Sequence, residues 1–176
     1  LKKKYPMETY HSNAPLKPIV QQSTHNTTSW IGHRSSETNE HISGQTFTCP
    51  AAGKLDCIEI FSVYVNKKIP VALTLYPFDT ERKIWGTALA TSTVEFSKTD
   101  NETWIAFPLK GLQLNKDMVY GFKLKTDDGL LGVGEAAGCL NQLPYAGGQE
   151  WAANTIDQKG KYFSYLSLAF KVDLRA

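Results

Sequence analysis

Hydrophobic and polar residues alternate in short runs along most of the chain. In residues 118–125 the apolar side chains occupy every second position, and Lys123 and Lys125 lie on the other side. Residues 166–172 follow the same rule, with Lys171 on the polar side. Because successive side chains of a strand point to opposite faces, both segments are predicted to be strands with one buried face.

Further runs of β-branched and aromatic residues are separated by turn residues at intervals of about ten positions. Strands are expected in this part of the pattern at residues 29–33, 44–49, 55–65, 71–78, 92–96, 103–109 and 130–134. The one mildly helical stretch, residues 87–90, is too short to form a helix alone, because helix nucleation is costly. About eight or nine strands without a repeat period predict an all-β, single-domain jelly-roll β-sandwich of two antiparallel sheets.

The first part of the chain differs from the rest. Residues 1–27 carry Pro, Ser, Asn, Gln and His with little periodicity. We interpret this segment as an extended leader or as a linker to a preceding module. The sandwich domain is expected at residues 28–176, since a chain of 176 residues suits one well-buried core better than two.

Charge and hydropathy argue against two classes of partner, nucleic acid and the interior of a membrane. The formal net charge is +2 and the basic residues are scattered, which argues against nucleic acid as a partner. No run of about 18 apolar residues is present, so no membrane-spanning helix is expected. The start of the sequence also lacks the apolar core of a signal peptide.

The three cysteines, Cys49, Cys57 and Cys139, have neither zinc-knuckle spacing nor an even number. They are expected to be free, buried thiols. A bridge between Cys49 and Cys57 would require irregular pairing, because a symmetric hairpin between them places Cys49 opposite Lys54.

Several core-strand and turn segments resemble those of jelly-roll modules that are appended to secreted bacterial glycan-active proteins. The similar segments are residues 44–48, 50–55, 58–61, 71–76, 86–92, 104–107 and 120–124. The same patterns occur in galactose-binding-like and carbohydrate-binding-module-like sandwiches. The resemblance implies this fold, a glycan as ligand, and a secreted or cell-surface location. No catalytic motif accompanies it.

Glycan recognition uses flat aromatic faces together with amides and carboxylates that bind hydroxyl groups. Residue types of this kind crowd residues 135–154, a stretch long enough to be functional if it is a loop. The candidate ligand-binding residues there are Asn141, Gln142, Tyr145, Gln149, Glu150, Trp151 and Asn154. Trp85, beside a polar connection, is a second candidate platform. The alternative is that Tyr145 and Trp151 form a lid packed over one end of the sandwich.

The other two tryptophans have different expected roles. Trp30 begins the first strand of the domain and is expected in the core. Trp104 lies on the polar side of its strand and is the better candidate for a surface ligand contact, although cross-strand packing with an outward Tyr or Lys would accommodate it equally well.

Metal and catalytic motifs receive little support. The histidines His11, His25, His33 and His41 are widely spaced, so no metal site and no cofactor is expected. Residues 127–129, Asp-Asp-Gly, are interpreted as a hairpin turn in preference to a structural calcium site.

The sequence also gives little support for a hydrolytic active site. There is no G-x-S-x-G motif for a serine nucleophile. Glu59, Glu95 and Glu135 lie on or beside predicted strands, but the sequence does not bring two of them within the distance that glycoside cleavage requires.

The sequence therefore predicts a non-catalytic carbohydrate-binding-like module. Its expected partner is a glycan or cell-surface polysaccharide, with an attached module preceding residue 1. The leading alternative is a structural or adhesive β-sandwich that binds a protein. A small polysaccharide lyase or hydrolase is the third and least favoured alternative.

Overall fold

The computed structural model describes the backbone of residues 16–175 and the side chains of residues 18–175. These residues form strands and one short 3-10 helix, Lys98–Asp100. The strands are β1 Leu16–Gln22, β2 Thr27–His33, β3 Glu40–Thr48, β4 Gly53–Val65, β5 Ile69–Asp79, β6 Ile84–Trp85, β7 Ala90–Phe96, β8 Thr103–Pro108, β9 Gln113–Leu114, β10 Val119–Lys125, β11 Leu130–Ala137, β12 Glu150–Asn154, β13 Lys161–Phe163, β14 Leu166–Leu168 and β15 Phe170–Arg175. Within this part of the chain, no helix is long and apolar enough to cross a membrane.

All pairings between these strands are antiparallel. One group contains β4, which pairs with β8, β9, β11 and β15, while β2 and β14 pair with β11 and β1 pairs with β15. The other group runs in the order β7, β5, β10, β3, β12 and β13, with β6 also paired to β5. Pairing of β2 with β3 joins both groups into one 15-stranded sheet. The expected all-β, antiparallel character is therefore confirmed.

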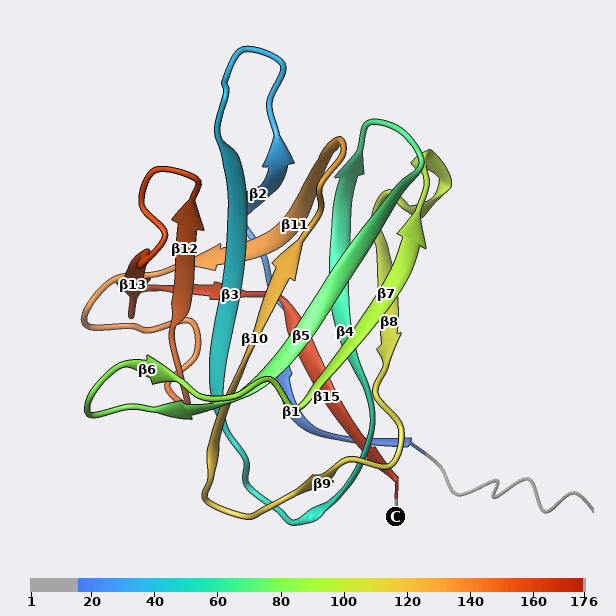
Figure 1. The fold of residues 1–176 in the computed structure, drawn as a ribbon. Helices are drawn as coiled ribbons and strands as arrows, with labels where there is room; N and C mark the ends of the chain where they lie inside the picture. Colours follow the sequence, from blue (N-terminus) through green and yellow to red (C-terminus); the bar gives the residue numbers. More distant parts are fainter. Residues whose placement is uncertain (1–15, 176) are drawn as a thin grey trace, which may run out of the picture.

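The sheet folds over a single apolar core. In Figure 1, β5 and β10 cross over β4 and β15. Phenylalanines fill the space between the two groups: Phe122 of β10 and Phe47 of β3 lie 5.6 and 6.1 Å, centroid to centroid, from the ring of Phe170 on β15. Phe96 and Phe107 make a similar contact at 5.7 Å. All five of these rings are fully buried.

The alternation in residues 118–125 is confirmed for most of the segment. Tyr120, Phe122 and Leu124 are buried, whereas Lys123 and Lys125 lie on the other face. The exception is Met118, which was expected on the buried side but precedes β10 and is 46% exposed.

The sheet begins earlier in the chain than expected. Within the segment interpreted as a leader or linker, β1 pairs with β15 from Leu16 to Gln22, and Val20 is only 6% exposed. Pro18 and the bulge that follows it interrupt the alternation, which is why the sequence pattern gave no strand here. Residues 1–15 of that segment lie outside the described part of the chain.

Two further expectations on strands need correction. The described residues contain fifteen strands instead of eight or nine, and four of them have only two or three residues. Residues 127–129 do not close a hairpin, since β10 pairs with β3 and β5 whereas β11 pairs with β2, β4 and β14. They connect the two groups of strands, and Asp128 forms an ion pair with Lys67 at 2.7 Å.

The cysteines are free, as expected. Cys49 and Cys57 are buried thiols, and burial raises the pKa of both. Cys139 differs from the expectation because it is exposed, in the loop between β11 and β12.

Candidate functional site: an aromatic groove on the outer face of the sheet

Four outward-facing residues lie in one row across β12, β3, β10 and β5. Trp151 pairs with Gly44, Gly44 with Lys123, and Lys123 with Thr74. Each of these residues alternates with a buried neighbour whose side chain points into the core. The register of three strand pairs therefore places a tryptophan and a lysine on the same outer surface.

Two glycines in the middle of strands allow large rings to lie flat on this surface. A Cβ atom at Gly121 would come within 2.6 Å of the Trp85 ring. A Cβ atom at Gly44 would come within 3.1 Å of Trp151 and 3.4 Å of Trp85. Glycine inside a strand often marks such a close approach, so both positions are part of the architecture of the site.

The β5–β6 hairpin places Trp85 over the sheet. Its turn is held by Asp79, whose Oδ1 accepts hydrogen bonds from the backbone N–H groups of Glu81 and Arg82, both at 3.0 Å. Trp85 then packs edge-on against Phe78, with ring centroids 5.1 Å apart. Its indole N–H donates to Tyr162 Oη at 2.9 Å, which ties this hairpin to β13.

The β12–β13 hairpin fixes Trp151 in the same way. Asn154 Oδ1 accepts from the backbone N–H groups of Ile156 at 2.9 Å and Asp157 at 2.7 Å. Gly160 has a φ of +72°, and a Cβ there would lie 2.6 Å from the Trp151 indole nitrogen. That indole N–H donates to the Lys159 carbonyl oxygen at 2.9 Å. Trp85 and Trp151 meet with their ring centroids 5.4 Å apart.

An ammonium group lies at the centre of these rings. Lys123 Nζ is 4.4 Å from the centroid of Trp151, 4.5 Å from that of Trp85 and 5.1 Å from that of Tyr76. Such contacts are each worth about 0.5 to 2 kcal/mol. Burial lowers the pKa of Lys123, because partial loss of water disfavours the charged form.

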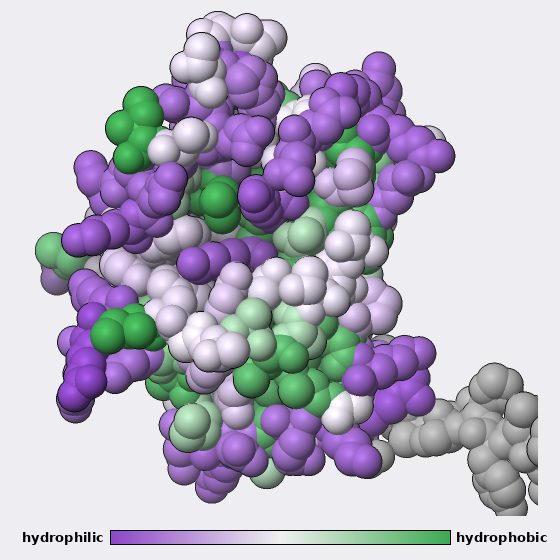
Figure 2. Space-filling view, in the orientation of Figure 1, coloured by the Kyte–Doolittle hydropathy of each residue, from purple (hydrophilic) through white to green (hydrophobic). Residues whose placement is uncertain are grey.

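Two adjoining cavities form a groove around Lys123. The first, about 450 Å³, runs along β12, β3, β10 and β5, and the second, about 640 Å³, lies between the two hairpins. Both are lined by Lys123, Trp151 and Gln158. Figure 1 shows the two hairpins projecting to the same side of β3, and Figure 2 shows pale and purple side chains gathered on this face over β10, β3 and β12. We call this feature the aromatic groove.

Three of the candidate residues from the sequence meet in the aromatic groove: Trp85, Trp151 and Asn154. Trp151 is only 2% exposed, so it forms the floor of the groove and supports its neighbours. Trp85 is partly exposed and lies nearer to solvent. Trp151 is therefore packed against its neighbours, as one of the two alternatives expected, and it also lines both cavities of the groove.

The remaining candidates lie elsewhere. Tyr145 packs edge-on against Phe170 of the core, with centroids 5.4 Å apart. Gln149 is tied to β3 through its backbone, and Glu150 is 1% exposed because it points away from Trp151, into the protein. Asn141 and Gln142 are exposed in the connection between β11 and β12, where Gln142 lines a separate cavity of about 420 Å³.

The stretch containing these candidates is also shorter as a loop than expected. Residues 135–137 belong to β11 and residues 150–154 to β12, so the connection spans residues 138–149.

Sequence reasoning missed Tyr76, Lys123 and Tyr162. Lys123 resembled an ordinary solvent-facing lysine of an alternating strand, and only the pairing of β10 with β3 and β5 shows what surrounds it. The available signal was the presence of Gly44 and Gly121 inside predicted strands.

The other two tryptophans lie away from the groove. Trp104 is stacked under Lys171, with Nζ 4.1 Å from the ring centroid. The partner is a lysine, as expected, and it reaches Trp104 from β15 across the intervening β4. Trp30 was expected in the core, but it faces outward, edge-on to Tyr64 and beneath Arg34, while its neighbour Ile31 is fully buried. The phase of β2 thus differs by one residue from the expected phase.

The carboxylates considered for glycoside cleavage lie in three different places. Glu95 forms an exposed ion pair with Lys68 at 2.9 Å. Glu135 neighbours the buried Glu150, and burial, followed by the Glu135 carboxyl, raises the pKa of Glu150. The described lining of the aromatic groove contains none of these three glutamates.

Glu59 belongs to a compact group with Cys57 and Asp173, whose ligand atoms lie within 4.8 Å of one another. Cys57 Sγ donates to Asp173 Oδ2 at 3.3 Å. Burial, followed by the Asp173 carboxyl, raises the pKa of Glu59. Among the described residues, these three side chains have types and separations that would suit a metal ion, and they lie on β4 and β15, away from the groove.

Comparison with known proteins identifies a structural neighbour. No protein-family model matches the chain, and no curated protein matches it in sequence. The chain is similar to the crystal structure of the cysteine protease and lectin-like domains of Cwp84, a surface layer associated protein of Clostridium difficile. The TM-score is 0.52 at 12% sequence identity, and the match covers 77% of this chain and 32% of that one. This chain thus spans about a third of its neighbour, and the likeness concerns the fold alone.

Proposed function

We propose that this protein is a non-catalytic carbohydrate-binding β-sandwich of the jelly-roll type, and that the aromatic groove is its glycan-binding site. The observation that carries the proposal is the convergence of Trp85, Trp151 and Tyr76 around Lys123 on one outer face of the sheet.

The groove combines the groups that saccharides require. Partly exposed rings of Trp85, Tyr76 and Tyr162 offer apolar surface to the C–H groups of a sugar. Asn154 and Gln158 add amides that exchange hydrogen bonds with hydroxyl groups. The two hairpins are held by internal hydrogen bonds, so the site is formed before a ligand arrives, which lowers the entropic cost of binding.

Absence of catalysis is part of the proposal. Cleavage of a glycosidic bond commonly uses two carboxyl groups that flank it. In the described lining of the groove, Glu40 is the one carboxylate. The close carboxyl pairs, Glu135 with Glu150 and Glu59 with Asp173, lie outside the groove. This distribution favours binding over hydrolysis or elimination.

The structural neighbour supports the same class of function. Its chain contains a lectin-like domain and comes from a surface layer associated protein. An all-β module with this likeness and an aromatic groove fits a secreted or cell-surface protein that recognises a polysaccharide, with an attached module before residue 1.

Substitution of Trp85 by alanine tests the site. We expect W85A to weaken retention by an immobilised polysaccharide that binds the parent protein at least tenfold, because the contact between the aromatic ring and the face of a sugar is lost together with the ring packed against Lys123. Trp104 is the matched control, since it is also partly exposed and also stacked against a lysine. W104A should bind like the parent protein. Affinity electrophoresis across a panel of polysaccharides measures both variants, and equal retention of W85A and the parent would rule out this site.

A protein partner is a second candidate function, favoured by two apolar residues at the hairpin tips. Ile84 is 52% exposed and Ile156 is 80% exposed, and both flank the groove. If the groove serves a protein interface, the double variant I84S/I156S should lose binding to that partner. A glycan-binding groove should retain its polysaccharide in the same variant.

A further inference from the structure

The charge of Lys123 is not balanced by a carboxylate. The ion pairs among the described residues do not include Lys123, and the shift of its pKa arises from burial alone. Aromatic rings supply its close contacts. A partly buried ammonium that has lost water and has no counterion is costly to keep charged, so an anionic partner would gain an interaction that the free protein lacks.

Further positive charges surround the same groove. Arg82, Lys83, Lys125 and Lys159 line it together with Lys123, against Glu40 as the described acidic lining residue. Lys125 also contacts Asp127 at 3.5 Å, an exposed pair that water screens. The formal net charge of the whole chain is only +2, so this excess of positive charge is local.

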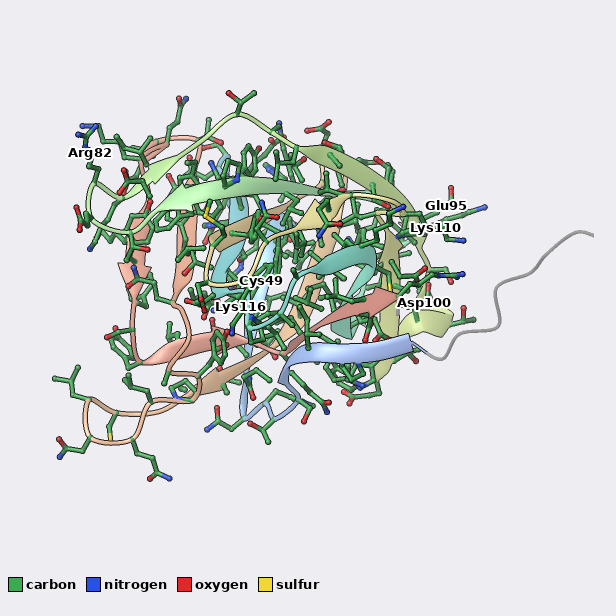
Figure 3. The ribbon with its side chains drawn as sticks, turned by 90° about the horizontal axis from the view of Figure 1, so that it is seen from below. Cys49, Arg82, Glu95, Asp100, Lys110 and Lys116 are labelled. Atoms are coloured by element: carbon green, nitrogen blue, oxygen red, sulfur yellow. The ribbon has the colours of Figure 1, made fainter. Side chains whose placement is uncertain are left out.

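Asp79, Glu81 and Asp157 belong to the two hairpins that flank the groove, and other acidic residues lie far from it. Figure 3 shows Arg82 near the tip of the β5–β6 hairpin, pointing outward on the side of β12 and β13, whereas Glu95 and Asp100 are at the opposite end of the molecule. A cleft with like charges along its walls concentrates ligands of the opposite charge.

The position of the ammonium also limits what a neutral sugar can contact. Lys123 Nζ lies over the rings of both Trp85 and Trp151 at about the distance of direct contact. The ring face that each tryptophan turns toward Lys123 is therefore already covered by a cation, whereas the rest of the partly exposed Trp85 ring stays open to solvent. A neutral sugar that displaced or covered this group would remove more water from it without supplying a counterion.

We propose that the aromatic groove selects an acidic saccharide, and that Lys123 pairs with its carboxylate, sulfate or phosphate group while Trp85 and Tyr76 contact the adjoining sugar rings. This inference rests on the proposed function and specifies the class of glycan.

The experiment compares acidic polymers with matched neutral ones. Polygalacturonate is tested against its fully methyl-esterified form, and dextran sulfate against dextran, by isothermal titration calorimetry at 50 and 300 mM NaCl. We expect at least tenfold tighter binding of one acidic polymer than of its neutral match, with an affinity that falls as salt rises. The two pairs distinguish a carboxylate ligand from a sulfate ligand.

Two lysine variants separate specific pairing from general surface charge. K123Q should reduce the ratio of acidic to neutral affinity to about one, with folding checked by near-UV circular dichroism. K171Q removes a lysine that is stacked on Trp104 in a similar way, outside the groove, and should leave the ratio unchanged. Equal effects of K123Q and K171Q would overturn the inference.

The remaining outcomes separate this inference from the proposed function. If a polymer binds with W85A-sensitive affinity but acidic and neutral forms bind alike, the acidic specificity is wrong and the glycan-binding site stands. If no polymer binds, or binding is insensitive to W85A, both proposals fail.

Discussion

Glu150 and Trp151 are consecutive residues of β12, and their side chains lie on opposite faces of the sheet, one in the interior and one beside the Lys123 ammonium. Trp151 faces outward and lies beneath Lys123, whereas Glu150 points inward, is 1% exposed and has no hydrogen-bond partner for its Oε2 atom. Burial raises the pKa of Glu150 above its ordinary value of 4.5, and the nearby Glu135 carboxyl raises it further. The folded protein therefore favours the protonated form of Glu150.

This protonation makes stability depend on pH. A carboxyl whose pKa is higher in the folded than in the unfolded state stabilises the fold fully below pH 4.5, and this contribution is lost as pH rises toward the folded pKa. We expect E150Q, a neutral group of the same shape, to remove this loss. The variant should exceed the parent in free energy of unfolding by on the order of 1 to 3 kcal/mol at pH 8 and match it near pH 4. Urea denaturation at both pH values measures the difference. Parallel pH curves for the two proteins would contradict a protonated Glu150.

The β5–β6 and β12–β13 hairpins and the strands beneath them hold one another in place. Trp85 can lie on β10 only because Gly121 has no side chain, and Trp85 in turn donates to Tyr162 on β13. The β5–β6 and β12–β13 hairpins are thus held over the sheet by contacts between residues about 77 positions apart.

A methyl group at Gly121 should displace Trp85 without disrupting the core. We expect G121A to shift the tryptophan fluorescence spectrum to longer wavelength and to weaken polysaccharide binding as much as W85A does. Gly53 offers a control in β4, where a Cβ would meet the end of a flexible side chain, Leu174 Cδ1, at 2.8 Å. G53A should leave both the spectrum and binding unchanged. Unchanged fluorescence in G121A would show that Trp85 does not rest on β10.

Local sequence patterns predicted the strands better than they predicted the site. The alternation of Phe122 and Leu124 identifies β10 and its buried face, because that information is contained in the strand itself. The environment of Lys123 cannot be read from the sequence of β10 alone, since it depends on which strands pair with β10 and in which register. Trp85 and Trp151 were selected as candidates because they are aromatic, but Tyr145 is also aromatic and packs on the core.

The described strands form one continuous sheet around the core, with β1, the first of them, at one edge beside β15, the last. β1 covers the edge of β15, which in turn pairs with β4. The irregular β1 sequence could not reveal this role, because pairing with β15 at the other end of the chain supplies its structure.

Two substitutions on opposite faces of β1 test its place in the fold. Val20 is 6% exposed in the core cluster, whereas the next residue, Gln21, is exposed. V20D should lower the free energy of unfolding by roughly 3 kcal/mol, because it buries an unpaired charge, and Q21D should change it by less than about 0.5 kcal/mol. Urea denaturation measures both. Similar stabilities of the two variants would contradict the packing of β1 on the core.

The aromatic groove contains two of the four tryptophans of the chain, Trp85 and Trp151, so the tryptophans report on it directly. Their indole N–H groups can be followed separately in nitrogen–proton correlation spectra during a titration with polygalacturonate or dextran sulfate oligosaccharides. We predict that the signals of Trp85 and Trp151 shift while those of Trp30 and Trp104 stay in place. Shifts at Trp30 or Trp104 with none at Trp85 and Trp151 would contradict ligand binding in the aromatic groove.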